Sequence, residues 1–385
     1  MNIRYSIWLF AAFLLSGCSW FGGDDGDGEI KPADLKDFNE EVNIVRRWSV
    51  SLGGADEKYR VSLRPSSSED KLFAANHQGD VFALALESGN KIWKMELGVS
   101  LSGGVGYGGG IVLVGSIEGE VYALNAVNGA ISWKRQMATE VLTAPHSNGK
   151  IVAVQTIDDK IYALKSDSGE EVWRHDGNAP ILSVRGTSSP LVTDNMVLAA
   201  FDSGKLVAFN TANGSLTWET RLALPKGRTE LQRMVDIDGD PLLVGDVIYS
   251  ASYQGQLGAI TRGTGRQLWS QESSSHQTPA FGRDKVFVTE ADDKLRAFDA
   301  GSGRVIWTNE DLFLRRLTAP VAFGGAIAVA DSFGYLHLLN MEDGRFMGRI
   351  KIDGSGIRAP MVVKSDLLIV QTNSGLIASL GIEPR

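Results

Sequence analysis

The sequence predicts an all-β fold, an eight-bladed β-propeller of four-stranded blades whose ring is closed by pairing the N- and C-terminal strands. The first observation is a repeat. The unit from Gly119 to Trp133, GEVYALNAVNGAISW, recurs with a period of 38 to 51 residues. The second is its pattern, a strand of alternating character, a turn ending in Asn128-Gly129 and a short strand closing on Trp133. Such a period with strand-like content is typical of one propeller blade per repeat.

The count of closing positions predicts eight blades, with seven as the alternative. Six complete copies run from Gly or Asp to Trp: Gly79–Trp93, Gly119–Trp133, Asp159–Trp173, Gly204–Trp218, Gly255–Trp269 and Asp293–Trp307. A seventh copy, Gly334–Gly348, has lost the Trp, and Gly375–Leu380 starts the unit once more. The segment around Trp48 is a closing strand with nothing before it. Pairing these two ends of the chain in one sheet completes an eighth blade, so that no blade of the ring is left incomplete.

Proline marks the start of most blades, because the first residue of a strand needs no ladder donor. It stands 14 residues before the Gly or Asp position at Pro65, Pro145, Pro190, Pro241, Pro279 and Pro320. From proline to tryptophan the module is always 28 residues, whereas the links between blades vary from 10 to 23 residues. Constant strands with variable links indicate a rigid scaffold that carries loops on one face.

The recurrent glycines and tryptophans have structural explanations. The turn before each closing strand ends in Gly, where a positive φ is expected. A Trp on an outer strand buries roughly 150–250 Å² and can donate a hydrogen bond from its indole nitrogen. Copies spread around a ring cannot converge on one ligand, so aromatic stacking on a ligand is the weaker interpretation.

Bulk properties exclude several function classes. The formal net charge of the 385 residues is −8, which argues against nucleic acid as a partner. No stretch after residue 20 is long and apolar enough to cross a bilayer. The single cysteine, Cys18, cannot form an internal disulfide.

The N-terminal segment predicts a lipid anchor at that cysteine. Arg4 precedes an apolar run, Ile7–Leu15, and Leu15-Ser16-Gly17-Cys18 resembles a bacterial lipobox. Residues 1–17 are then a lipoprotein signal peptide, and Cys18 is the lipidated first residue. An ordinary secretory signal with an incidental cysteine is the alternative. By the same resemblance, Ser19 favours the outer membrane. Residues 18–41, rich in Gly and acid, are expected to form a flexible tether, and 42–385 the propeller.

The repeat also carries a family resemblance. The pattern Ala-x-(Asn/Asp)-x-x-(Ser/Thr/Asn)-Gly-x-x-x-Trp, as at Ala123–Trp133 and Ala297–Trp307, resembles the tryptophan-docking motif of PQQ quinoprotein propellers. Together with the lipobox, the blade count and the length, the whole chain resembles the BamB family of outer-membrane assembly lipoproteins. That resemblance implies a non-enzymatic scaffold without a cofactor, facing the periplasm. The implied partners are a POTRA domain of BamA, through it the rest of the β-barrel assembly (BAM) complex, and nascent outer-membrane proteins.

The resemblance also implies two partner-binding loops. A Leu-Ser-Leu-Arg-like run is matched by Leu182-Ser183-Val184-Arg185, with Val184 replacing the second Leu, and Asp-x-Asp is matched by Asp236 and Asp238. The residues alone point to the same place, because these loops join consecutive blades and should lie side by side. Their apolar centre edged by opposite charges is a plausible partner patch. The alternative is that the aliphatic residues fold back onto the propeller and the aspartates are merely solvated.

The other motifs in the sequence lack the neighbouring residues or elements that their chemistry requires. Gly104–Gly109 matches GxGxxG but precedes no helix. Asp236-x-Asp238-x-Asp240 lacks the Gly and Glu of a calcium loop, which leaves only a weak calcium site open. The histidines are His77, His146, His175, His276 and His337, and none has metal-ligand spacing.

Two alternative functions stay open. One is a PQQ-dependent dehydrogenase, although such enzymes resemble larger propellers and often carry adjacent cysteines. The other is a lipoprotein that binds peptidoglycan or another envelope ligand.

Overall fold

The computed structural model describes residues 31–54, 63–177, 188–223 and 235–385. The chain divides into two units, Met1–Lys31 and Pro32–Arg385. Only Lys31 of the first unit is described, so the elements named here belong to the second. Its described residues form strands, turns and loops, and no helix among them is long and apolar enough to cross a membrane.

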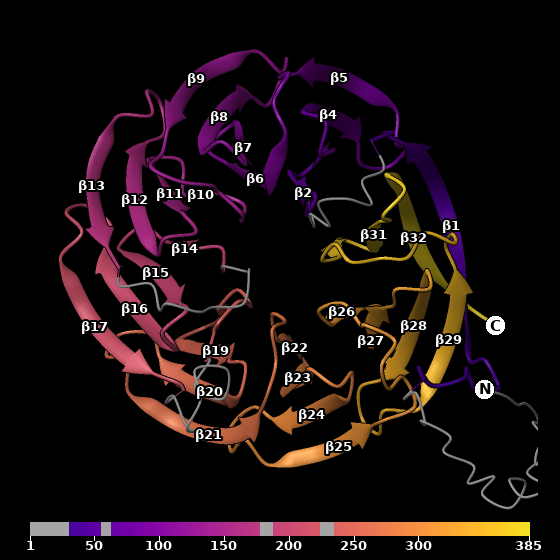
Figure 1. Cartoon of the computed structure of the whole chain (residues 1–385). Helices are drawn as coiled ribbons and strands as arrows, with labels where there is room; N and C mark the ends of the chain where they lie inside the picture. The colour runs from indigo at the N-terminus through magenta and orange to yellow at the C-terminus, as the bar shows by residue number, and fades with distance from the viewer. Residues whose placement is uncertain (1–30, 55–62, 178–187, 224–234) are drawn as a thin grey trace, which may run out of the picture. The chain divides into compact units, whose positions relative to one another are not determined.

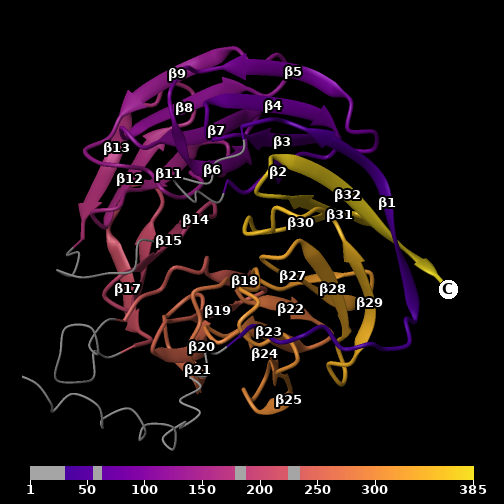
Figure 2. The same ribbon diagram turned by 45° about the vertical axis from the view of Figure 1, so that its right-hand side comes forward.

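The second unit is a ring of eight four-stranded antiparallel sheets (Figures 1 and 2). In seven of the sheets the strands lie in chain order from the centre of the ring outward, and in the eighth the first strand of the chain takes the outermost place. The prediction of an eight-bladed propeller is therefore confirmed, and the alternative of seven blades is wrong.

Each of the first four blades begins with an inner strand near the centre of the ring. The first blade is β2 Ser66–Ser67, β3 Lys71–Ala75, β4 Asp80–Ala85 and β5 Lys91–Glu96. The second is β6 Leu101–Gly108, β7 Ile111–Ser116, β8 Glu120–Asn125 and β9 Ile131–Gln136. The third is β10 His146–Ser147, β11 Ile151–Gln155, β12 Lys160–Lys165 and β13 Glu171–Asp176. The fourth is β14 Leu191–Val192, β15 Met196–Phe201, β16 Lys205–Asn210 and β17 Leu216–Arg221.

The other four blades complete the ring. The fifth is β18 Leu242–Val244, β19 Val247–Ala251, β20 Gly255–Thr261 and β21 Gln267–Ser273. The sixth is β22 Ala280–Gly282, β23 Lys285–Thr289, β24 Leu295–Asp299 and β25 Val305–Asn309. The seventh is β26 Val321–Phe323, β27 Ala326–Ala330, β28 Tyr335–Asn340 and β29 Phe346–Lys351. The eighth is β30 Val362–Lys364, β31 Leu367–Gln371, β32 Leu376–Pro384 and, from the other end of the chain, β1 Val42–Ser51.

The eighth blade closes the ring as the sequence predicts. Strand β1 pairs antiparallel with β32 from Val42 opposite Pro384 to Ser51 opposite Leu376. A register shift between Arg46 and Trp48 interrupts this ladder. Because the first and last strands of the propeller share one sheet, unfolding either end breaks the ladder that holds the other.

A tryptophan on the outer strand of seven blades joins each blade to the next. The Trp133 indole nitrogen donates to the Ser166 carbonyl oxygen in the following blade at 2.8 Å. Equivalent bonds of 2.8 to 3.2 Å are made by Trp48, Trp93, Trp173, Trp218, Trp269 and Trp307. Each ring lies against the turn glycine of the next blade, and these glycines have φ near +70°. The structural explanation of both residue types is thereby confirmed.

The glycine-rich run that matches GxGxxG forms the inner strand β6. A Cβ atom on Gly106 would lie 1.8 Å from the Pro145 carbonyl oxygen, and one on Gly108 would lie 2.2 Å from that of Ser147. These glycines let β6 approach the third blade more closely than any side chain would allow.

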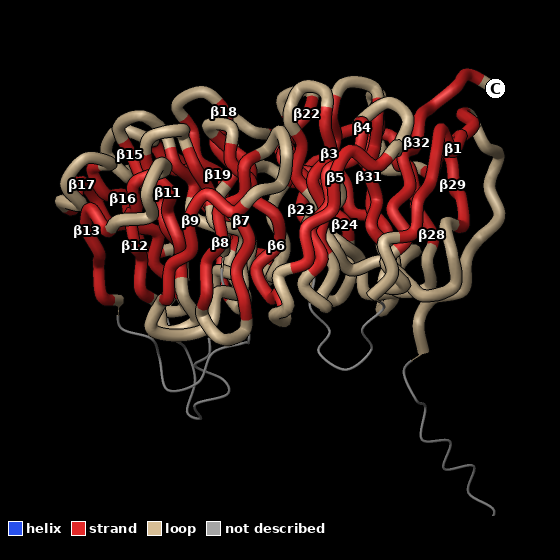
Figure 3. The backbone as a smooth tube through the Cα atoms, turned by 90° about the horizontal axis from the view of Figure 1, so that it is seen from above, coloured by secondary structure: helices blue, strands red, loops and turns tan. Residues whose placement is uncertain are grey.

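The loops lie on two opposite faces of the ring (Figure 3). We call the face that carries the links between blades, together with the loops between second and third strands, the link face. The opposite face carries the tight turns, as at Asp70, whose carbonyl oxygen accepts from the Leu86 amide at 3.0 Å.

Tryptophan docking can be tested with a matched pair of glycine substitutions. In Gly169→Ala the new Cβ would lie 2.7 Å from the Trp133 ring, whereas in Gly98→Ala it would meet nothing within 4 Å; both glycines have φ of +70°. In both variants the free energy of unfolding should fall by about 1 kcal/mol, because alanine is strained at a positive φ. We expect Gly169→Ala to lose roughly a further 1–3 kcal/mol from overpacking, measured by urea unfolding. Equal losses in the two variants would contradict the docking role.

Candidate functional site

Of the residues that the sequence assigns to partner binding, only the aspartates can be located. Leu182, Val184 and Arg185 lie outside the described residues, as does the predicted lipidation site Cys18. Asp236 and Asp238 lie on the link between the fourth and fifth blades, on the link face. An isolated bridge holds this link to the fifth blade, with the Tyr253 amide donating to the Asp236 carbonyl oxygen at 2.7 Å.

Asp236 is a fully buried carboxylate at a junction of blades. Its side chain is 0% exposed, and neither carboxylate oxygen has a hydrogen-bond partner among the described residues. Burial, with the negative charges of Asp238 and Asp202, raises the pKa of Asp236 to about 9. The sequence led us to expect a charged edge of the patch here. The structure instead places the carboxylate where ionisation is costly.

The acidic cluster, which we define as Asp159, Asp202, Asp236 and Asp238, spans three consecutive blades. Asp159 occupies the position at which most blades carry Gly, with φ of +60°. Its carboxylate is buried, and the described part of the chain offers it no hydrogen-bond partner. Burial and the charge of Asp202 raise the pKa of Asp159 to about 7.

Asp238 is the member of the cluster nearest to solvent. Its side chain is 11% exposed, and one carboxylate oxygen lies 3.1 Å from Nδ1 of His276 on the next link. The His276 ring stacks on Tyr253, with ring centroids 4.2 Å apart. The other carboxylate oxygen has no hydrogen-bond partner in the segments that the structure describes.

Asp240, at the end of the same link, points away from the other two. Its carboxylate pairs with Arg64 of the first blade and accepts from the Ser189 amide at 2.6 Å. Its own amide donates to the Thr278 hydroxyl at 2.9 Å. The three aspartates therefore do not converge as in a calcium loop. Among the described residues, no group of three His, Cys, Asp or Glu could hold a metal ion.

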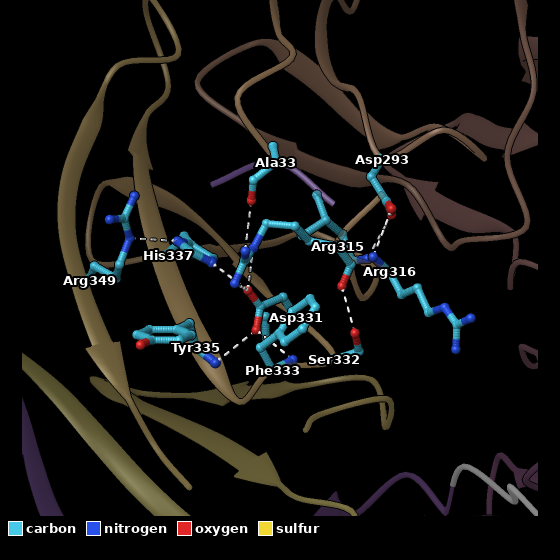
Figure 4. A network of polar contacts seen from close by, with 12 residues as sticks. Ala33, Asp293, Arg315, Arg316, Asp331, Ser332, Phe333, Tyr335, His337 and Arg349 are labelled. Atoms are coloured by element: carbon cyan, nitrogen blue, oxygen red, sulfur yellow. Dashed lines mark hydrogen bonds and ion pairs between the residues drawn. The ribbon is translucent and has the colours of Figure 1, made fainter. Parts of the chain in front are cut away.

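A second polar site, which the sequence analysis missed, lies in the seventh blade (Figure 4). The Arg315 guanidinium donates to the buried Asp331 carboxylate at 2.8 and 2.7 Å. His337, also buried, bridges Asp331 and Arg349, with 3.1 Å to each. Since Arg349 can only donate, His337 Nδ1 accepts and Nε2 carries the proton. Burial lowers the pKa of His337, which keeps the ring neutral.

This network holds residues 32–41, which we call the N-terminal strap, against the sixth and seventh blades. Arg315 donates to the Ala33 carbonyl oxygen at 2.9 Å, and Arg349 to that of Lys36 at 3.0 Å. The Phe38 ring lies 5.3 Å from that of Phe346.

Charged contacts along the strap complete its attachment. Lys36 pairs with Asp311 at 2.6 Å, Glu40 with Arg385 at 3.0 Å and Glu41 with Arg345 at 2.8 Å. The sequence led us to expect a flexible tether as far as residue 41. The structure differs because Phe38 and Leu35 find apolar partners on the propeller, which composition alone does not reveal.

Comparison with known proteins places the chain in a family. A family model described as outer membrane protein assembly factor BamB matches residues 77–309 and 291–383. The BamB of Pseudomonas aeruginosa is 48% identical over 97% of this chain and 98% of its own length. The BamB of Escherichia coli K12 is 33% identical over 97% of both chains.

This chain belongs to the BamB family. The crystal structure of BamB from Moraxella catarrhalis superposes with a TM-score of 0.82 at 30% identity, covering 88% of this chain and all of that one. The quinohemoprotein alcohol dehydrogenase from Comamonas testosteroni also superposes, with a TM-score of 0.69, 12% identity and coverage of 88% and 76%. At that identity the likeness concerns the fold alone, so the resemblance to BamB is confirmed and that to PQQ enzymes is distant.

The buried carboxylate of Asp159 in this BamB-family chain makes stability depend on pH. Its folded pKa is raised, so the stability it contributes is present below its unfolded pKa near 4 and is lost as pH rises through about 7. Asp159→Asn stays neutral at every pH. We therefore expect its free energy of unfolding, relative to that of the wild type, to be roughly 2 kcal/mol higher at pH 8 than at pH 5. Urea unfolding at the two pH values measures this, with the exposed Asp70→Asn as control. An equal difference at both pH values would refute the assignment.

The strap can be tested by proteolysis, because Lys36 at its middle is a trypsin site. Phe38→Ala removes the ring contact with Phe346, which should lower the free energy of local opening by about 1–2 kcal/mol. Cleavage after Lys36 should then accelerate roughly tenfold, while the thermal midpoint of the propeller stays near that of the wild type. Leu268→Ala, on the outer strand of the fifth blade, is the control. Unchanged cleavage in Phe38→Ala would show that the strap does not depend on this contact.

Proposed function

We propose that this chain is a non-enzymatic scaffold lipoprotein of the BAM complex that assists the assembly and insertion of β-barrel proteins into the outer membrane. It binds a periplasmic POTRA domain of BamA through Asp236 and Asp238 together with Leu182, Val184 and Arg185. Lipidated Cys18 anchors it in the outer membrane, with the propeller in the periplasm. Its partners then include the rest of the complex and nascent outer-membrane proteins.

Membership in the BamB family supports the assembly role, since the relatives are named outer membrane protein assembly factors. The observation that carries the binding site is the acidic cluster on the link face. Ionising Asp159 and Asp236 in this cluster without a described donor costs several kcal/mol, which is why the pKa of each is raised. A cationic group on the partner would recover much of that cost by pairing with the cluster, most readily at the part-exposed Asp238.

The strap supports the proposed tether and changes its reach. From Cys18 to residue 41 the tether would have 24 residues and span at most about 85 Å, whereas from Cys18 to Lys31 it has 14 and spans about 50 Å. The Ala33 amide donates at 2.9 Å to the Phe313 carbonyl oxygen, on the link between the sixth and seventh blades. The first residues of the strap therefore lie at the link face, on the same side as Asp236 and Asp238.

Co-purification of the full chain from membranes in mild detergent tests the proposal. We expect a POTRA-containing barrel protein to be recovered with the wild type. Recovery should fall roughly tenfold with Asp238→Ala, because a buried charge pair across an interface is worth about 2 kcal/mol or more. The double variant Leu182→Ala/Arg185→Ala should reduce recovery of the barrel protein to a similar extent. Asp70→Ala, which removes an exposed carboxylate from the opposite face, should leave recovery unchanged.

The outcomes separate the function from the site. Recovery that is undiminished in both variants would move the site to another surface and keep the scaffold role. Absence of any barrel protein from the wild-type sample would reject the scaffold role. Dye reduction by purified protein after addition of PQQ and calcium would contradict the non-enzymatic assignment.

A further inference from the structure

Arg64 reaches across the inside of the ring from the first blade to the fifth. It immediately precedes Pro65, the residue before the innermost strand of the first blade, and its partner Asp240 stands in the same position before Pro241. In a ring of eight blades, the first and fifth are four steps apart in either direction. The ion pair therefore joins opposite sides of the propeller.

The path of Arg64 is lined by blades between those two. Its second terminal nitrogen lies 2.9 Å from Nε2 of His146 in the third blade and 3.5 Å from the Ser189 hydroxyl before the fourth. Burial and the charge of Arg64 lower the pKa of His146 to about 4, so the neutral ring accepts this hydrogen bond. Gly104 of the second blade leaves room for the backbone of Arg64, since a Cβ there would lie 2.7 Å from its amide nitrogen.

Arg64 contacts the ends of both links that carry the predicted partner residues. Asp240 ends the link with Asp236 and Asp238, and Ser189 ends the link with Leu182, Val184 and Arg185. The two ends are joined to each other as well, because the Ser189 amide donates to Asp240. One guanidinium from the opposite blade thus ties both ends together.

We propose that Arg64 is a positioning residue for the partner site, which holds the end of the link that carries Asp236 and Asp238 in the arrangement that the partner binds. This inference rests on the proposed function. A guanidinium suits the task because its planar fork can donate to Asp240 and His146 at once, which a lysine ammonium on a flexible stem cannot do as rigidly. Both charges are partly shielded, with side chains 23% and 21% exposed, so the pair is less screened than a surface pair.

The test measures binding of the full chain, in detergent, to purified POTRA domains. We expect Arg64→Met and Asp240→Asn each to weaken binding roughly tenfold, about 1.4 kcal/mol. The double variant should be no weaker than either single one, because both changes break the same contact. Arg47→Met, which removes an exposed ion pair with Glu383 on the outer rim, is the matched control. Arg64→Lys provides a second variant should Arg64→Met fail to fold, and it should bind between wild type and Arg64→Met.

Amide hydrogen exchange of the free protein provides a readout independent of the partner. Exchange at Ser189 and Asp240 should accelerate severalfold in Arg64→Met and remain unchanged in Arg47→Met. Binding and exchange that both match the wild type would overturn the inference. Weaker binding with unchanged exchange would also overturn it, because Arg64 would then contact the partner directly. If the wild type does not bind POTRA domains, the proposed function fails, whatever the exchange shows.

Discussion

The structure depends on the docking of one blade's tryptophan on the next blade's turn. Seven of the eight junctions use this contact, and each combines a hydrogen bond to a backbone carbonyl with a ring that is buried in five cases and half-buried for Trp48 and Trp269. The eighth junction cannot, because the third and fourth strands of the eighth blade come from opposite ends of the chain and no turn joins them. Gly348 therefore stands where the seventh blade would carry its Trp. Its Cβ position is only 3.2 Å from the Val42 side chain.

The strap lies beside that junction, on the outer strand of the seventh blade. It runs along the outer strand β29 and ends with the Glu41 amide donating to the Met347 carbonyl oxygen at 2.7 Å. Arg46 on β1 donates to the Ile352 carbonyl oxygen at 2.8 Å, which fastens the eighth blade to the seventh. At this junction the polar contacts therefore add to an apolar cluster, in which Val42 and Ile44 of β1 pack with residues of the seventh and eighth blades.

The repeating part of the fold could be predicted from the sequence because its contacts repeat at fixed spacing. Gly129, Trp133 and Pro145 each recur in phase, so the blade count, the strand order and the closure all follow from them. The candidate site can be located only in part, because Leu182, Val184 and Arg185 lie outside the described residues. Asp236 and Asp238 were found by resemblance to a family motif, yet nothing in the local pattern showed that Asp236 is fully buried.

The contacts that escaped prediction join residues far apart in the chain. Arg64 and Asp240 are separated by 176 positions, and Arg315 and Ala33 by 282. No periodicity links such residues, since each occurs once and its partner is set by the ring geometry. The sequence shows no metal-ligand spacing for His146 and His337 and gives no sign of their partners. His337 is fully buried and His146 is half-buried, and each completes a network whose other members lie on different elements.

The docked blades and the acidic cluster on the link face have opposite effects on the stability of the protein. The docked blades contribute stability, whereas the cluster around Asp236 reduces it, because the buried carboxylates of Asp159 and Asp236 find no hydrogen-bond partner among the described residues. A buried carboxylate site that destabilises the free protein gains more binding free energy from a cationic partner than a solvated carboxylate site would. In the proposed function, that gain requires the carboxylates to keep their positions until the partner binds. A contact such as Arg64 with Asp240, anchored on the far side of the ring, can resist the repulsion among the aspartates in a way that contacts within the link cannot.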